Sequence, residues 1–124
     1  MATTTMTVTD HDATVQDGIV LIDFWAEWCP PCRKFGPIFE RVSARNEDAV
    51  FAKVDTDAEP ELAQKYSIAS IPTLVIYRDG IPVFGQAGAL PEPALEEVLR
   101  LVRELDMDDV RAKYADQLAG AEQS

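Results

Sequence analysis

Short apolar runs along the first two thirds of the chain indicate the strands of a sheet. Residues 19–25 form an apolar run broken only by Asp23 and rich in β-branched and aromatic side chains. Such a run predicts a strand that is buried on both faces. Residues 50–54 and 73–78 predict two further strands, and the weak alternation over residues 5–8 predicts a short edge strand. Strands buried on both faces imply a parallel or mixed central sheet.

The segments between these strands carry apolar residues at helical spacing. Between residues 32 and 45 the apolar positions recur with a helical period, at Phe35, Ile38, Phe39 and Val42. They predict one helix, which we expect to be kinked at Gly36-Pro37. Residues 59–66 predict a short helix with Pro60 in its first turn, and residues 10–16 predict a single helical turn. The alternation of strands and helices predicts an α/β fold.

A hairpin and a helix follow. Asp79-Gly80 lies between two apolar runs and predicts a type I′ turn that joins residues 73–78 to residues 81–86. Pro82 cannot donate a ladder hydrogen bond, so the second strand is expected at the sheet edge. After Pro91, one apolar stripe predicts a helix that packs on the sheet; its members are Leu95, Val98, Leu99, Val102 and Leu105.

The last 19 residues extend this domain, which we place at residues 1–105. Residues 106–124 carry a second apolar set at helical spacing: Met107, Val110, Tyr114 and Leu118. On a straight helix this set would point about a third of a turn away from the preceding stripe. We therefore expect a bend near residues 106–108, followed by a short acidic, amphipathic helix. That helix is expected to fold back onto the domain, and docking on a partner is the alternative.

The strongly negative net charge of the chain argues against some classes of binding partner. The 124 residues have a net charge of −11, and nine of the 22 acidic side chains follow Pro91. Such a chain repels nucleic acid and anionic membrane surfaces. No apolar run approaches the roughly 20 residues of a membrane-spanning helix. The first 18 residues lack the features of a secretory signal, so we expect a cytoplasmic protein.

The candidate chemistry lies in the segment Trp28-Cys29-Pro30-Pro31-Cys32, at the predicted strand-to-helix junction. Two cysteines with this spacing can close a disulfide across the first helical turn. Cys29 precedes the helix, where free N–H groups and the helix dipole stabilise a thiolate, so it is expected to be the nucleophile. Cys32 lies closer to the core and is expected to be the resolving thiol. Trp28 and the two prolines are expected to keep the site rigid and exposed.

Two cysteines with this spacing have three other possible interpretations. A structural zinc site needs four ligands, and the only other soft ligand is His11, which we expect in a surface turn. A purely structural disulfide would close a very short loop and constrain the unfolded chain little. Inert core cysteines do not fit the flanking tryptophan and prolines.

Asp23 is a second candidate for a functional residue, because a lone carboxylate in a buried strand is costly and is usually functional or paired. Asp55 and Asp57 are expected to be strand-end and helix-cap residues.

The sequence resembles thioredoxin over about residues 5–105. The resemblance is carried by VLIDFWAEWCPPC, Pro37, AKVDTD, SIASIPTLVIYRDG and AGAL, in that order. It implies the thioredoxin fold, a central mixed β-sheet flanked by helices, here with a short extra C-terminal helix. It also implies a cytosolic dithiol–disulfide oxidoreductase that acts on protein disulfides and is reduced by NADPH through thioredoxin reductase. No metal or organic cofactor is implied, and we expect a monomer.

The resemblance assigns roles to particular residues. Cys29 matches the attacking cysteine, Cys32 the resolving one, and Pro72 the cis-proline beside the disulfide. A cis bond at Pro72 would leave the Ile71 backbone free to pair with an extended substrate peptide. The implied substrate-binding patch consists of Trp28, Pro31, Ile71, Pro72, Ala87, Gly88 and Ala89. A simple strand-to-helix turn is an equal interpretation of its last three residues.

The resemblance also gives Asp23 a role in proton transfer at Cys32, with Lys53 nearby. The alternative is an Asp23–Lys53 ion pair with no catalytic part. Pro30 departs from the glycine that typical thioredoxins carry, at a position where the family tunes its redox potential. Two alternative functions therefore stay open: a disulfide oxidase or isomerase with the same site, and a non-catalytic binding module built around Trp28.

Overall fold

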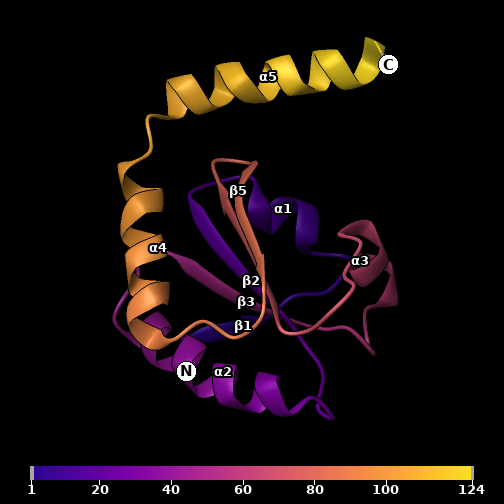
Figure 1. Ribbon diagram of the computed structural model, residues 1–124, viewed down its shortest axis with the longest axis vertical. Coiled ribbons are helices and arrows are strands. Elements are labelled where there is room, and N and C mark those ends of the chain that lie inside the picture. Colours follow the sequence, from indigo (N-terminus) through magenta and orange to yellow (C-terminus); the bar gives the residue numbers. More distant parts are fainter. Residues whose placement is uncertain (1, 124) are drawn as a thin grey trace.

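The computed structural model describes residues 2–123, which form one mixed sheet with helices on both of its faces (Figure 1). The strands are β1 (Thr3–Thr5), β2 (Ile19–Trp25), β3 (Val50–Asp55), β4 (Thr73–Arg78) and β5 (Ile81–Ala87). The helices are α1 (His11–Val15), α2 (Pro30–Ala44), α3 (Pro60–Lys65), α4 (Glu92–Glu104) and α5 (Met107–Gln123). The strand order is β1-β3-β2-β4-β5, and β3 pairs in parallel with both β1 and β2. Because β4 is antiparallel to β2 and β5, the predicted mixed sheet is confirmed.

Alternation along β2 divides the core into two layers. Leu21 packs with α2 and α4, whereas its neighbours Val20 and Ile22 pack with the layer that contains Leu62 of α3. All three side chains are completely buried, as a central strand covered on both faces requires. By the same alternation, Asp23 lies on the α2 side of the sheet. The alternation of β2 therefore places the buried carboxylate beneath α2.

The predicted hairpin is confirmed. Asp79 and Gly80 have φ angles of +53° and +86°, as a type I′ turn requires at both of its central residues. Pro82 lies on the edge strand β5. The predicted N-terminal edge strand is also present, but it covers Thr3–Thr5 and not residues 5–8. The pairing does not continue because the backbone N–H groups of Thr7 and Val8 donate to the side chains of Asp10 and Glu59.

The predicted bend after α4 is confirmed. The guanidinium Nη1 of Arg78 donates to the carbonyl oxygens of Val102 (2.8 Å) and Leu105 (3.0 Å), which holds the C-terminal end of α4. Asp106 then accepts hydrogen bonds from the backbone N–H groups of the two following aspartates, in the manner of an N-cap, and α5 begins. None of the helices in residues 2–123 is long and apolar enough to cross a membrane.

Only the beginning of α5 contacts the body of the protein. Val110 and Tyr114 are half-buried and face a shallow hollow beside Pro82 of β5, but Leu118 is 50% exposed. Figure 1 shows α5 extending across the end of the molecule, beyond the β4–β5 hairpin. Packing of the whole helix on the domain stays a prediction.

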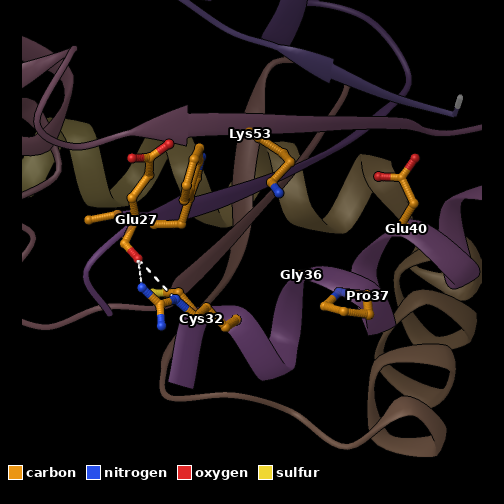
Figure 2. Close-up of a pocket in the computed structure, with 9 residues that line it drawn as sticks. Glu27, Cys32, Gly36, Pro37, Glu40 and Lys53 are labelled. Atoms are coloured by element: carbon orange, nitrogen blue, oxygen red, sulfur yellow. Dashed lines mark hydrogen bonds between the residues drawn. The ribbon is translucent and has the colours of Figure 1, made fainter. Parts of the chain in front are cut away.

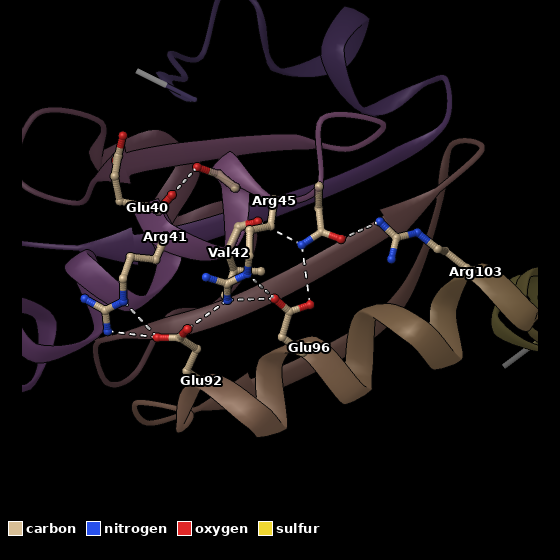
Figure 3. A network of polar contacts seen from close by, with 9 residues as sticks. Glu40, Arg41, Val42, Arg45, Glu92, Glu96 and Arg103 are labelled. Atoms are coloured by element: carbon tan, nitrogen blue, oxygen red, sulfur yellow. Dashed lines mark hydrogen bonds and ion pairs between the residues drawn. The ribbon is translucent and has the colours of Figure 1, made fainter.

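A network of charged side chains joins α2 to α4 (Figure 3). Arg45 forms ion pairs of 2.8 Å with both Glu92 and Glu96, and Arg41 forms one of 2.9 Å with Glu92. At the other end of α4, Arg103 donates to Asn46. Exposed ion pairs contribute little one by one, so this network supplements the buried cluster that the apolar side chains of α2 and α4 share.

Candidate active site

Cys29 occupies the N-cap of α2. Its φ and ψ angles of −96° and 107° are extended, and its sulfur accepts a hydrogen bond of 3.3 Å from the backbone N–H of Cys32. The two cysteines form a disulfide with a Cα–Cα distance of 5.3 Å. Both predicted positions are confirmed: Cys29 lies just before the helix, and Cys32 lies within its first turn. An N-cap sulfur lies at the positive end of the helix dipole, which stabilises a thiolate.

The two prolines limit the backbone donors around this sulfur. Pro30 and Pro31 fill the first two helical positions and have no N–H group, so Cys32 supplies the first one. Arg33 does not face the sulfur, because its guanidinium donates two hydrogen bonds, of 3.1 and 2.9 Å, to the carbonyl of Glu27. These bonds hold the loop that leads into the cysteines.

The two cysteines line different hollows. Cys29 lines a groove of about 390 Å³ between Trp28 and the segment that ends at Ile71. Cys32 lines a separate hollow of about 600 Å³, into which Lys53 and Glu40 also point (Figure 2). The disulfide thus separates a mostly apolar groove from a more polar hollow.

The expected exposure of Cys29 is wrong. Cys29 is only 2% exposed and Cys32 only 5%. Residues on both sides of the groove cover the Cys29 sulfur, and the Ile71 carbonyl oxygen lies 3.6 Å from it.

Trp28 forms one wall of the groove and is 64% exposed. Its indole Nε1 donates a hydrogen bond of 2.9 Å to the carboxylate of Asp57, which limits the orientations of the ring. Asp57 is therefore not the helix cap that the sequence predicted. Asp55 does lie at a strand end, where it accepts a hydrogen bond from the N–H of Asp57. Nothing in the local sequence indicates the Trp28–Asp57 contact, because the partners are 29 residues apart.

The other residues of the predicted patch connect the segment at Ile71 to the end of β5. The Ile71–Pro72 bond is cis, and the Ile71 side chain packs against the cluster formed by Ala26 and the two cysteines. Gly88 has a φ angle of +98°, and its N–H donates a hydrogen bond of 2.8 Å to the carbonyl of Pro72. Ala87 is paired with Thr73 at the end of β5, and Ala89 follows it in the exposed link to α4. The structure thus brings the end of β5 to the proline beside the disulfide.

Asp23 is 1% exposed, and its Oδ1 has no hydrogen-bond partner within residues 2–123. Burial raises the pKa of Asp23 to about 7, although the positive charge of Lys53 acts in the opposite direction. Lys53 is the register partner of Asp23 on β3, but its Nζ lies over the Trp25 ring, 4.8 Å from the centroid. Asp23 is therefore a buried acid whose charge changes near neutral pH.

His11 is not the surface residue that the sequence predicted. It is 3% exposed and contacts Asp12, Tyr66 and, edge to face, Tyr77. This burial could not be predicted from the local pattern, because α1 has only five residues. Residues 2–123 contain no cluster of three or more His, Cys, Asp or Glu side chains that could hold a metal ion.

Comparison with known proteins agrees with this geometry. The thioredoxin family model matches residues 2–101. A putative thioredoxin 2 from Streptomyces coelicolor is 54% identical over 121 residues, which cover 97% of this chain and 90% of the relative. Thioredoxin from Staphylococcus aureus is 43% identical over 100 residues, which cover 80% of this chain and 96% of the relative.

Solved structures give the same result. A mutant thioredoxin from Halobacterium salinarum superposes with a TM-score of 0.74 at 34% identity, covering 83% of this chain and 91% of that one. Plasmodium falciparum thioredoxin gives a TM-score of 0.72 at 33% identity, with coverage of 79% and 96%. The chain belongs to the thioredoxin family, and with its Cys29–Cys32 disulfide it is a thioredoxin-like protein disulfide reductase.

Proposed function

We propose that Cys29 attacks the substrate disulfide and that Cys32 completes the reaction. The Cys29 thiolate bonds to one substrate sulfur, the substrate S–S bond breaks, and the other substrate sulfur leaves as a thiolate. Cys32, once deprotonated, attacks the Cys29 sulfur, which releases the second substrate sulfur and closes the Cys29–Cys32 disulfide. The observation that carries this assignment is the N-cap position of Cys29 at the base of the groove.

Asp23 is proposed to accept the proton of Cys32. A base is most effective when its pKa lies near the working pH, and burial brings the pKa of Asp23 to about 7. Cys32 is buried on α2, and Asp23 lies on the face of the sheet that α2 covers. Lys53 acts against the rise in the pKa of Asp23, which keeps part of the carboxyl groups ionised near neutral pH. Lys53 is thus proposed to be a positioning and electrostatic residue.

The groove is proposed to bind an extended segment of the substrate protein. Trp28, Pro31 and Ile71 line it, and Pro72 and residues 87–89 would contact the chain beyond it. Electrons would come from NADPH through a thioredoxin reductase in the cytoplasm, and the redox-active disulfide itself would carry them. No bound cofactor enters this scheme.

The two prolines favour a reductase over an oxidase. With one helix N–H donor at its sulfur, the Cys29 thiolate is less stabilised than it would be with several. A less stabilised thiolate makes the dithiol a stronger reductant, because the reduced form is then higher in free energy. Pro30 is therefore proposed to lower the redox potential, which makes the dithiol more reducing.

The reduction of insulin by NADPH and thioredoxin reductase tests the function. The wild-type protein is expected to turn over, and both Cys29→Ser and Cys32→Ser are expected to be inactive. Only Cys32→Ser should accumulate a mixed disulfide with insulin, detectable by mass spectrometry, because it keeps the attacking sulfur. A trapped adduct on Cys32 in the Cys29→Ser protein would reverse the proposed roles.

Asp23→Asn is expected to stabilise the oxidised protein in alkaline but not in acidic solution. The pKa of Asp23 is raised on folding, so ionising this carboxyl costs stability progressively as the pH rises from about 4 to about 7. The asparagine avoids this cost, which approaches about 4 kcal/mol at pH values above about 7. Urea unfolding at acidic and alkaline pH measures the difference between variant and wild type. A difference independent of pH would show that Asp23 does not titrate in this range.

Asp23→Asn should also slow the release of the mixed disulfide, although the protein is more stable. Stopped-flow measurement of that step separates the two effects. An unchanged rate would leave Asp23 with a structural role only.

Pro30→Gly is expected to make the protein slightly more oxidising. The new N–H lies in the first turn, where its geometry toward the Cys29 sulfur is poor. It should therefore lower the pKa of Cys29 by at most about one unit, which corresponds to at most about 30 mV. Equilibration with a glutathione buffer measures the potential. Pro30→Ala is the matched control, because it adds the same N–H without the freedom of glycine. A more reducing alanine variant would contradict the donor argument.

A further inference from the structure

A chain of polar side chains runs from the exposed Asp12 through the buried His11 to Tyr66 and Tyr77, and it takes no part in the chemistry above. The His11 ring contacts Asp12 through Nδ1 (2.7 Å) and the Tyr66 hydroxyl through Nε2. The Tyr66 hydroxyl lies 2.7 Å from that of Tyr77. The three rings meet edge to face, and Tyr66 also packs against Phe24, with ring centroids 5.1 Å apart. The chain thus joins α1, the end of α3 and β4.

Each polar atom of the chain can be satisfied. The Asp12 carboxylate accepts from Nδ1–H, which leaves Nε2 of a neutral imidazole as an acceptor for the Tyr66 hydroxyl. Tyr66 then accepts from Tyr77. The side-chain hydrogen bond from His11 also lowers the pKa of Asp12, which keeps the carboxylate ionised. His11 is therefore the link that orients the Tyr66 ring from the α1 side.

Tyr66 lies at the point where α3 turns into the wall of the groove. It is the C-cap of α3, and its N–H donates to Leu62. Ser67 follows with a φ angle of +51°, and the N–H of Ile68 donates a hydrogen bond of 2.9 Å back to the carbonyl of Ala63. The segment from Ile68 to Ile71 then lines the groove opposite Trp28. The direction of this wall depends on how the end of α3 is held.

Ile68 and Ile71 connect the wall to the same core layer as Tyr77. Ile71 also packs against the cysteine cluster, and its carbonyl oxygen lies 3.6 Å from the Cys29 sulfur. A shift of Tyr66 would therefore displace the wall in two ways: through the backbone at the end of α3, and through the side chains on which Ile68 and Ile71 pack.

We propose that His11 is a positioning residue that, through Tyr66, holds residues 68–71 as the substrate-binding wall of the groove. The inference rests on the proposed function, because it concerns the binding of a protein substrate in that groove. His11 touches neither the disulfide nor the groove, so it acts on substrate affinity and not on the chemical step. A small disulfide that does not need the wall should not respond to its loss.

The test compares His11→Phe and His11→Gln with the wild type. Phenylalanine keeps a buried ring but loses both hydrogen bonds, whereas glutamine can still reach the Tyr66 hydroxyl. His11→Phe is expected to raise the KM for insulin by about fivefold, because, of its two lost hydrogen bonds, the one to Tyr66 holds the wall. Its kcat, and its rate with hydroxyethyl disulfide, should be unchanged. His11→Gln is expected to restore most of the KM.

Two further variants separate positioning from general loss of stability. Val15→Ala shortens a buried side chain on the same helix but leaves the polar chain intact, so it should destabilise the protein without raising KM. Tyr66→Phe removes the hydroxyl that His11 contacts and should raise KM as His11→Phe does. Hydrogen–deuterium exchange of residues 66–71 should be faster in His11→Phe and Tyr66→Phe than in Val15→Ala.

Three results would overturn the proposal: an unchanged KM in His11→Phe, an equal rise in KM in Val15→Ala, or an equal loss of rate with hydroxyethyl disulfide. A wild-type protein that reduces hydroxyethyl disulfide but not insulin would contradict the proposed function itself. In that case the exchange of residues 66–71 still decides whether His11 holds the wall: equal exchange in His11→Phe and Val15→Ala would show that it does not.

Discussion

The chemistry of this protein depends on one junction, the passage from β2 into α2 that places the Cys29 sulfur at a helix N-cap. The sulfur takes the place of the oxygen that a serine or aspartate would present there, and it accepts the Cys32 N–H. An N-cap atom is stabilised when it carries negative charge. In the proposed mechanism, this position makes Cys29 the nucleophile, although the two cysteine side chains are chemically identical.

The rest of the fold keeps this junction in place and surrounds the two cysteines with different environments. The buried strand β2 leads into the helix, which packs on α4 through a shared buried cluster and the Arg45 ion pairs. Cys29 faces the groove, and Cys32 faces the hollow that Lys53 lines. Burial of the Asp23 carboxyl has a cost in stability, and in the proposed mechanism it provides a base that is active at neutral pH.

Much of this arrangement could be predicted from the sequence, because its signals are local. The apolar run of β2, the cysteine spacing and Asp79-Gly80 each determine the structure of their own segment. The contacts that could not be predicted join distant segments. Trp28 donates a hydrogen bond to Asp57, which is 29 residues away in the sequence, and His11 contacts Tyr66, which is 55 residues away. The burial of Cys29 was missed for the same reason, since the segment at Ile71 that covers it is 42 residues away.

Alkylation of the reduced protein by iodoacetamide tests the central claim, that the N-cap makes Cys29 the more reactive thiol. The rate at each cysteine can be followed by mass spectrometry between mildly acidic and mildly alkaline pH. The account predicts that Cys29 reacts well before Cys32, and that its rate begins to rise at a lower pH because its thiolate forms first. Equal rates at the two cysteines, or faster reaction at Cys32, would contradict it.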